Sequence, residues 1–125
     1  MTNIESTDTQ NKESMLIDHA LEIWRLKPLV YKIISKLEFK DQNKYVSQYN
    51  WFENKATSYL ESEGISFVEY ETGTIYDIGL PINPLNIEEF NKDDTLYIKQ
   101  VLQPVIMRYG KIMKTGTVLL QKEVK

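Results

Sequence analysis

The spacing of the apolar residues changes at Gly64, and this change constrains the fold more than any other feature of the sequence. Before Gly64, apolar residues recur every three or four positions, which is typical of helices with one buried face. After Gly64 the chain has short runs of β-branched and aromatic residues broken by Gly and Pro, which is typical of strands and turns. The sequence therefore predicts an α+β protein, with an N-terminal helical hairpin followed by a small, mainly antiparallel β domain.

The N-terminal part begins with a polar segment. Residues 1–13 contain one large aliphatic residue, Ile4, and we expect them to form a disordered tail, because they cannot bury enough surface to offset the entropy of ordering. Ser14 is a candidate N-cap for the helical stretch that follows. Pro28 interrupts the helical pattern, so a kinked helix or two abutting helices are expected over residues 15–38.

A second helix is predicted between a cap at Asp41 and a left-handed C-terminal residue at Gly64. Its apolar residues are mainly aromatic and follow a four-three-four-three spacing that places them on one face. Residues 14–63 should therefore form a helical hairpin used for dimerisation or docking. The residues of this face are Tyr45, Tyr49, Phe52, Ala56 and Tyr59.

Residues 64–125 are predicted to form the β domain, which we expect to bind a partner. A first strand is expected over residues 65–70. The region 97–122 contains two strand runs hinged at Tyr109-Gly110-Lys111. Pro104 lacks a backbone donor, so it marks an edge, a bulge or a break in the first of these runs.

Composition argues against several classes of function. The net charge is −3, from 15 basic and 18 acidic side chains mixed along the sequence, and the lack of a basic block argues against nucleic-acid binding. The absence of cysteine excludes disulfides and thiolate chemistry. No apolar run approaches the length of a membrane-spanning helix and no signal peptide is visible. We therefore expect a soluble cytoplasmic protein that does not bind membranes.

No standard catalytic motif is present, and we expect a protein that is not an enzyme and that uses no cofactor or metal. His19 is the only histidine, which is too few for a triad or a histidine-based metal site. Paired carboxylates leave a small acid–base enzyme as a third, weaker interpretation, although solvated charge explains them as well. These pairs are Glu61 and Glu63, Glu69 and Glu71, Glu88 and Glu89, and Asp93 and Asp94.

The predicted turn near Gly110 carries residue types that are enriched where proteins bind one another. Met, Arg and Tyr each combine apolar surface with an adaptable or polar end. The alternative is that the turn is only solvated and that its methionines pack inside. The candidate partner-binding residues are Met107, Arg108, Tyr109, Lys111 and Lys114.

Residues 60–80, LESEGISFVEYETGTIYDIGL, are similar to the passage of the GrpE nucleotide-exchange factors that leads from the helices to the β domain. The family has a small residue ending the helix, a strand with G-[IV]-x-x-[IV], and then G-x-x-[FY]-D. The matching residues here are Gly64, Ile65, Val68, Gly73, Tyr76 and Asp77. The closing hairpin resembles the family's V-x-x-V-L-Q run and its final apolar strand, through Ile98, Val101, Leu102, Gln103, Ile112, Met113, Val118 and Leu120.

The chain also departs from the family pattern. The family's Gly-Tyr after the first run is Val105-Ile106 here, and its Arg-Pro-Ala is Lys114-Thr115-Gly116. Lysine keeps the positive charge but not the planar fork of arginine. The family's His-Glu-Ala after the aspartate has no counterpart. Only the predicted tail and one kinked helical stretch precede Asp41, where the family has a long pairing helix.

The resemblance implies a co-chaperone that binds the nucleotide-binding domain of a DnaK-type ATPase, or a related actin-fold ATPase, and promotes ADP release. It also implies a homodimer paired through the helical hairpins, which the aromatic helix face would suit. It places partner contacts on the hairpin, with Lys114 at the matching arginine position. The alternative is a non-enzymatic adaptor or scaffold subunit on the same fold, without exchange activity.

Overall fold

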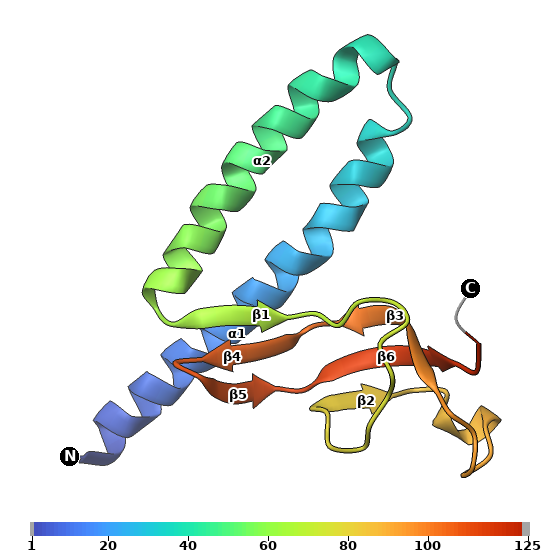
Figure 1. Cartoon of the computed structure of the whole chain (residues 1–125). Coiled ribbons are helices and arrows are strands. Elements are labelled where there is room, and N and C mark those ends of the chain that lie inside the picture. Colours follow the sequence, from blue (N-terminus) through green and yellow to red (C-terminus); the bar gives the residue numbers. More distant parts are fainter. Residues whose placement is uncertain (1, 124–125) are drawn as a thin grey trace. The chain divides into compact units, whose positions relative to one another are not determined.

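The structure is a computed structural model that describes the backbone of residues 2–123 and the side chains of residues 10–123 (Figure 1). The chain divides into two compact units, Met1–Ile65 and Ser66–Lys125. The division lies next to Gly64, where the apolar spacing changes. The predicted fold class is confirmed, because a helical hairpin precedes a set of small sheets.

The first unit is a hairpin of helices α1 (Thr2–Ile34) and α2 (Phe39–Ser62) (Figure 1). Contacts along its length hold the two helices together. Lys12 Nζ lies 3.3 Å from Glu63 Oε1, and the Tyr31 hydroxyl donates a hydrogen bond of 2.9 Å to Asn50 Oδ1. Gly64 has φ 80° and its N–H bonds to Glu61 O, so it ends α2 in the predicted left-handed conformation.

The N-terminal helix differs from its prediction. The structure continues α1 as one helix through residues 2–13, where a disordered tail was expected. It also runs through Pro28 as one helix, so the alternative of two abutting helices is wrong, whereas that of a single helix over this stretch holds. Residues 2–13 contain no Gly or Pro that would break the helix. Adding turns to an existing helix also costs far less than starting a new one. The Lys12–Glu63 ion pair also links this segment to the end of α2. Ser14 consequently lies inside the helix and does not cap it.

The start of α2 also differs from its prediction. Glu38 is the N-cap residue and makes no hydrogen bond through its side chain. Asp41 lies within the first helical turn, and its N–H bonds to Glu38 O at 2.9 Å. A carboxylate in this position still interacts favourably with the positive end of the helix dipole.

The β region contains two three-stranded sheets, with strand orders β1-β4-β5 and β2-β6-β3. The pairs β3–β6 and β4–β5 are antiparallel, whereas β2 pairs with β6 in parallel. A short 3-10 helix, η1 (Ile87–Glu89), follows β2. The strands are β1 (Ile65–Val68), β2 (Ile82–Pro84), β3 (Tyr97–Gln103), β4 (Val105–Arg108), β5 (Lys111–Lys114) and β6 (Gly116–Gln121).

One long hairpin supplies strands to both sheets. Its outward arm is β3 followed by β4, and Pro104 separates them, so the predicted break is confirmed. Its return arm is β5 followed by β6, separated at Thr115. The two arms approach closely beside this bend, because a Cβ on Gly116 would lie 2.9 Å from Gln103 O. Glycine is therefore required where the hairpin passes from one sheet to the other.

One cluster of buried residues in the second unit lies on the sheet that contains β6. Alternate residues of β6 are buried, and Val118 and Leu120 pack with Leu96 and Ile98. Asn86 extends the pairing beyond β2, because its side-chain amide bonds to both backbone groups of Leu120. The Asn86 Nδ2 to Leu120 O distance is 3.0 Å and the Leu120 N to Asn86 Oδ1 distance is 2.9 Å. On β4, Val105 and Ile106 are also buried, and they anchor the hairpin that carries the candidate site.

Candidate protein-binding site

The hairpin joining β4 and β5 turns at Tyr109 and Gly110. Arg108 pairs with Lys111, and both central residues have positive φ, 49° for Tyr109 and 80° for Gly110. Positive φ at both positions is the signature of a type I′ turn, whose twist matches that of the flanking strands. Gly110 fits this conformation readily at the second central position. The first central position, which Tyr109 occupies, is usually asparagine, aspartate or glycine. The tyrosine is therefore unexpected.

Tyr109 is held in a strained and exposed conformation. Among the non-glycine residues that the structure describes, it alone has positive φ, a region that costs a residue with a Cβ about 1–2 kcal/mol. Its side chain is 69% exposed, so burial does not offset this cost. Arg108 Cζ lies 5.3 Å from the ring centroid, which provides a weak cation–π contact. Residues with a strained backbone cluster at functional sites, which makes Tyr109 a candidate site residue.

The other predicted site residues lie on the two strands beside the turn. Lys111 and Lys114 are exposed at the two ends of β5, and Ile112 between them is 51% exposed. Met107 is half-buried on β4 opposite Ile112. The structure thus brings all five predicted residues onto one hairpin, although Met107 is half-buried. We call Arg108, Tyr109, Lys111, Ile112 and Lys114 the hairpin tip.

The strands that carry the hairpin tip contain no acidic residue. Residues 96–122 include no Asp or Glu, although the whole chain has 18 acidic residues and a net charge of −3. Five of the 15 basic residues fall in this stretch, namely Lys99, Arg108, Lys111, Lys114 and Lys122. In the part of the chain whose side chains are described, Lys111 and Lys114 form no ion pair with a carboxylate. From the sequence, Ile112 was matched only to an apolar place of the family's final strand and was not predicted as a site residue. The separation of charge was not noted either, although a count of charge by segment would have found it.

The predicted aromatic face of α2 is divided between the inside and the outside of the helical hairpin. Tyr49 is 7% exposed and packs edge-on against Tyr31, with ring centroids 5.9 Å apart. Burial, with a smaller contribution from the negative charge of Glu53, raises the pKa of the Tyr49 hydroxyl to about 12. Tyr49 therefore belongs to the interior. Tyr45, Phe52 and Tyr59 remain 42%, 41% and 69% exposed, and Ala56 is half-buried.

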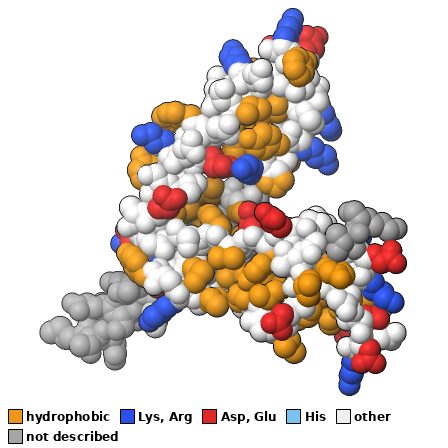
Figure 2. All heavy atoms as spheres, viewed as in Figure 1, with side chains coloured by type: hydrophobic (Ala, Val, Ile, Leu, Met, Phe, Trp, Pro, Cys, Tyr) orange, Lys and Arg blue, Asp and Glu red, His pale blue; other side chains and the backbone are white. Residues whose placement is uncertain are grey.

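The exposed aromatic residues of α2 continue into an apolar surface on α1. Figure 2 shows apolar side chains gathered along the helical hairpin. Ile33 and Leu37 of this surface line a groove of about 470 Å³ together with Tyr45. We call the exposed set Leu26, Leu29, Ile33, Leu37, Tyr45 and Phe52 the helical apolar face.

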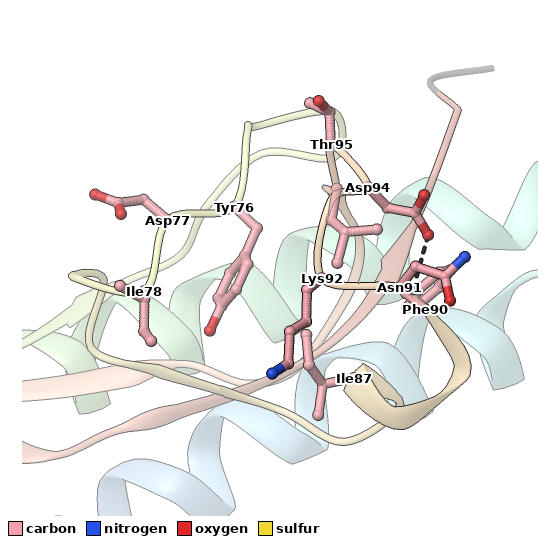
Figure 3. Close-up of a pocket in the computed structure, with 10 residues that line it drawn as sticks. Tyr76, Asp77, Ile78, Ile87, Phe90, Asn91, Lys92, Asp94 and Thr95 are labelled. Atoms are coloured by element: carbon pink, nitrogen blue, oxygen red, sulfur yellow. Dashed lines mark hydrogen bonds between the residues drawn. The ribbon is translucent and has the colours of Figure 1, made fainter.

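A cavity of about 550 Å³ lies among the loops of the second unit (Figure 3). Its walls include Tyr76, Ile87 and Lys92, which extend toward the same side in Figure 3. The Asp94 carboxylate accepts a hydrogen bond of 2.9 Å from the Asn91 N–H and lies 3.5 Å from Lys122 Nζ. Asp94 is therefore engaged in holding the loop together, and it does not face the cavity as an unpaired acid or base.

The paired carboxylates noted in the sequence lie at exposed or half-buried positions on helix ends, loops and η1. Within the described residues, no group of three or more His, Asp or Glu side chains is arranged to hold a metal ion. Likewise, none of the described helices combines the length and the apolar character that crossing a membrane requires.

Comparisons with known proteins found no matching family model, no matching curated protein and no matching solved structure.

Proposed function

We propose that this protein is a GrpE-like co-chaperone, which binds the nucleotide-binding domain of a DnaK-type ATPase through the hairpin tip and promotes ADP release. The observation that carries the proposal is the strained, 69% exposed Tyr109, flanked by cationic side chains on an acid-free hairpin. A folded protein gains nothing from this strain by itself. A partner that buries the tyrosine ring supplies the compensating free energy.

The mechanism needs no catalytic side chain. A protein that binds the open form of an ATPase cleft more tightly than the closed form shifts the equilibrium toward the open form. Because the coupling is reciprocal, ADP then binds more weakly by the same free energy. The hairpin tip suits such a role, since β4 and β5 belong to a three-stranded sheet and Val105 and Ile106 of β4 are buried.

The same proposal includes a homodimer formed through the helical apolar face. Leu26, Val30 and Ile33 follow a four-three spacing along α1, which is the spacing of a helix-pairing seam, and Leu37 lies in the loop that follows α1. The exposed fractions of Leu29 and Ile33 are 53% and 55%, so a large apolar area is open to solvent in one chain. Phe52→Glu should convert the dimer to a monomer in analytical ultracentrifugation, whereas Lys36→Glu, outside this face, should not.

The decisive experiment measures ADP release. A DnaK-type ATPase from the same organism is loaded with a fluorescent ADP analogue and mixed with excess ATP in a stopped-flow instrument. We expect the protein to accelerate release at least tenfold. Lys114→Glu should remove most of this acceleration, because it reverses a charge at the tip.

Lys99→Glu is the matched control, since Lys99 is an exposed lysine of the same acid-free stretch but lies on β3, in the other sheet. It should leave release unchanged. No acceleration by the unaltered protein, or equal loss in both variants, would refute the proposed exchange activity.

An adaptor function on the same fold is the second candidate, and one observation favours it. Where the family carries alanine, this chain has Gly116, and a Cβ there would lie 2.9 Å from Gln103 O. The hairpin is therefore packed more closely at its bend than alanine allows. Capture of the ATPase without any change in ADP release, and without release of the complex by ATP, would assign the protein to this class.

A further inference from the structure

Strand β5 has an open edge. It lies at the end of the order β1-β4-β5, so it has a hydrogen-bonded neighbour on one side only within the described residues. An open edge presents unpaired backbone groups that can pair with another polypeptide. Ile112 is 51% exposed in the middle of this strand, and both ends carry exposed lysines.

The pairing register identifies which backbone groups face outward. Arg108 and Lys111 flank a two-residue turn and form the first pair, in which both residues exchange hydrogen bonds. The next pair, Met107 and Ile112, is therefore of the non-hydrogen-bonded kind. The N–H and C=O of Ile112 consequently point away from β4, toward the open edge. They form a matched donor and acceptor for one residue of an added strand. The pairing shifts register between Met107–Ile112 and Ile106–Lys114, so the regular part of the edge ends at Ile112.

The charges at this edge select the chemistry of that strand. Lys111 and Lys114 have no carboxylate partner among residues 10–123, and no acidic residue occurs between positions 96 and 122. A second copy of β5 would bring the same cations to one edge without a compensating charge. An acidic strand would instead place carboxylates beside both lysines. Charge complementarity thus favours an acidic partner over self-association.

We propose that the open edge of β5 binds an extended acidic segment of a partner protein as an added strand. This inference deepens the proposed function and rests on its use of the hairpin tip as the partner-binding surface. The bound residue opposite Ile112 carries an aliphatic side chain, because it shares a face with Ile112 and Met107. The two residues that flank it in the added strand carry carboxylates, and these lie on the face of the sheet that carries Lys111.

The test uses a fluorescein-labelled peptide of nine residues that alternates Glu and Val, with binding measured by fluorescence anisotropy. We expect saturable binding that weakens with added salt. The same peptide with Lys in place of Glu should bind at least tenfold more weakly. Equal binding of the two peptides would overturn the proposed selection of acidic strands.

Backbone methylation of the peptide tests the strand pairing itself. Two further peptides are methylated on the amides of all Val residues or of all Glu residues. In antiparallel addition the Val amide faces Ile112, so the Val-methylated peptide should lose at least tenfold in affinity while the Glu-methylated peptide binds normally. In parallel addition the Glu amides face Ile112, so the Glu-methylated peptide should lose affinity while the Val-methylated peptide binds normally. Unchanged binding of both methylated peptides would overturn the proposal.

Variants of the protein provide the reciprocal test. Ile112→Pro removes the outward N–H but no hydrogen bond to β4, whereas Ile112→Ala keeps the N–H. We expect at least tenfold weaker binding for proline and a smaller loss for alanine. If Ile112→Pro does not fold, the double variant Lys111→Glu with Lys114→Glu serves in its place, with Lys92→Glu and Lys99→Glu together as the matched charge control. Loss of affinity in the control equal to that of the double variant would contradict the placement on β5.

The two proposals fail separately. Peptide binding at β5 without capture of a DnaK-type ATPase would refute the proposed function and leave the strand site intact. Accelerated ADP release without peptide binding would retain the exchange factor and refute strand addition. In that case Lys111 and Lys114 would serve to protect the edge from aggregation.

Discussion

Replacing Tyr109 by asparagine should stabilise the fold and weaken partner binding at the same time. Tyrosine at φ 49° carries a cost of about 1–2 kcal/mol, most of which asparagine avoids because its short side chain tolerates the left-handed region. The variant loses the contact between Arg108 and the ring, which is worth about 0.5 kcal/mol at an exposed site. The net expectation is a gain of roughly 0.5–1 kcal/mol.

Thermal unfolding measures the first effect. A gain of this size should raise Tm by about 2–6 °C for a domain of this size. Tyr109→Phe is the matched control, because it keeps both the ring and the strained backbone and should leave Tm unchanged. The second effect is measured by ADP release, where Tyr109→Asn should cost about tenfold in apparent affinity for the ATPase, as expected for a buried aromatic anchor.

The result that would refute this reasoning is a lower Tm for Tyr109→Asn, since it would mean that the tyrosine contributes to the fold and is not strained. A raised Tm with undiminished ATPase affinity would keep the account of the turn but remove Tyr109 from the partner-binding surface.

Three further predictions concern the fold. Gly116→Ala should lower the free energy of unfolding in urea by about 1–3 kcal/mol, because its Cβ would lie 2.9 Å from Gln103 O; the matched change Thr115→Ala at the exposed neighbouring position should cost much less. Asn86→Asp should cost about 1–3 kcal/mol in the same assay, because the carboxylate faces Leu120 O without a donor, and equal stability would contradict the bonding described for Leu120. Tyr49→Phe should stabilise the protein slightly at neutral pH, since the buried hydroxyl has no hydrogen-bond partner by geometry. The pKa of Tyr49 rises from 10.0 to about 12 on folding, so the unaltered protein loses stability relative to Tyr49→Phe as the pH rises from 10 toward 12. Between pH 9 and pH 11.5, Tyr49→Phe should therefore lose less unfolding free energy than the unaltered protein does. Tyr59→Phe should lose as much as the unaltered protein.

Features set by local chemistry were predictable from the sequence. Gly64 ends α2 because glycine accepts the left-handed conformation at low cost, and Pro104 separates two strands because it has no N–H. The turn at Gly110 was predictable for the same reason. The predicted α+β class follows from the apolar spacing, which local geometry imposes on each element.

Features set by distant partners were not predictable. Residues 2–13 are polar, yet α1 continues through them and Lys12 forms an ion pair with Glu63, which is far away in the sequence. The parallel pairing of β2 with β6 depends on contacts with the C-terminal strand, and no local signal in β2 encodes it. The burial of Tyr49 against Tyr31 likewise divides an aromatic row that looked uniform on a helical wheel. At the hairpin tip, the residue types were predictable but the strain at Tyr109 and the open edge of β5 were not.

The central position of β6 also bears on how the chain acquires its structure during synthesis. β6 is the last described strand in chain order, yet it lies between β2 and β3. The helical hairpin has mostly local contacts and can form while the ribosome is still translating the β region. β2 and β3 must instead wait, without their shared neighbour, until Gly116–Gln121 has emerged. Through that interval the nascent β region exposes apolar strands, which is when a polypeptide depends most on molecular chaperones.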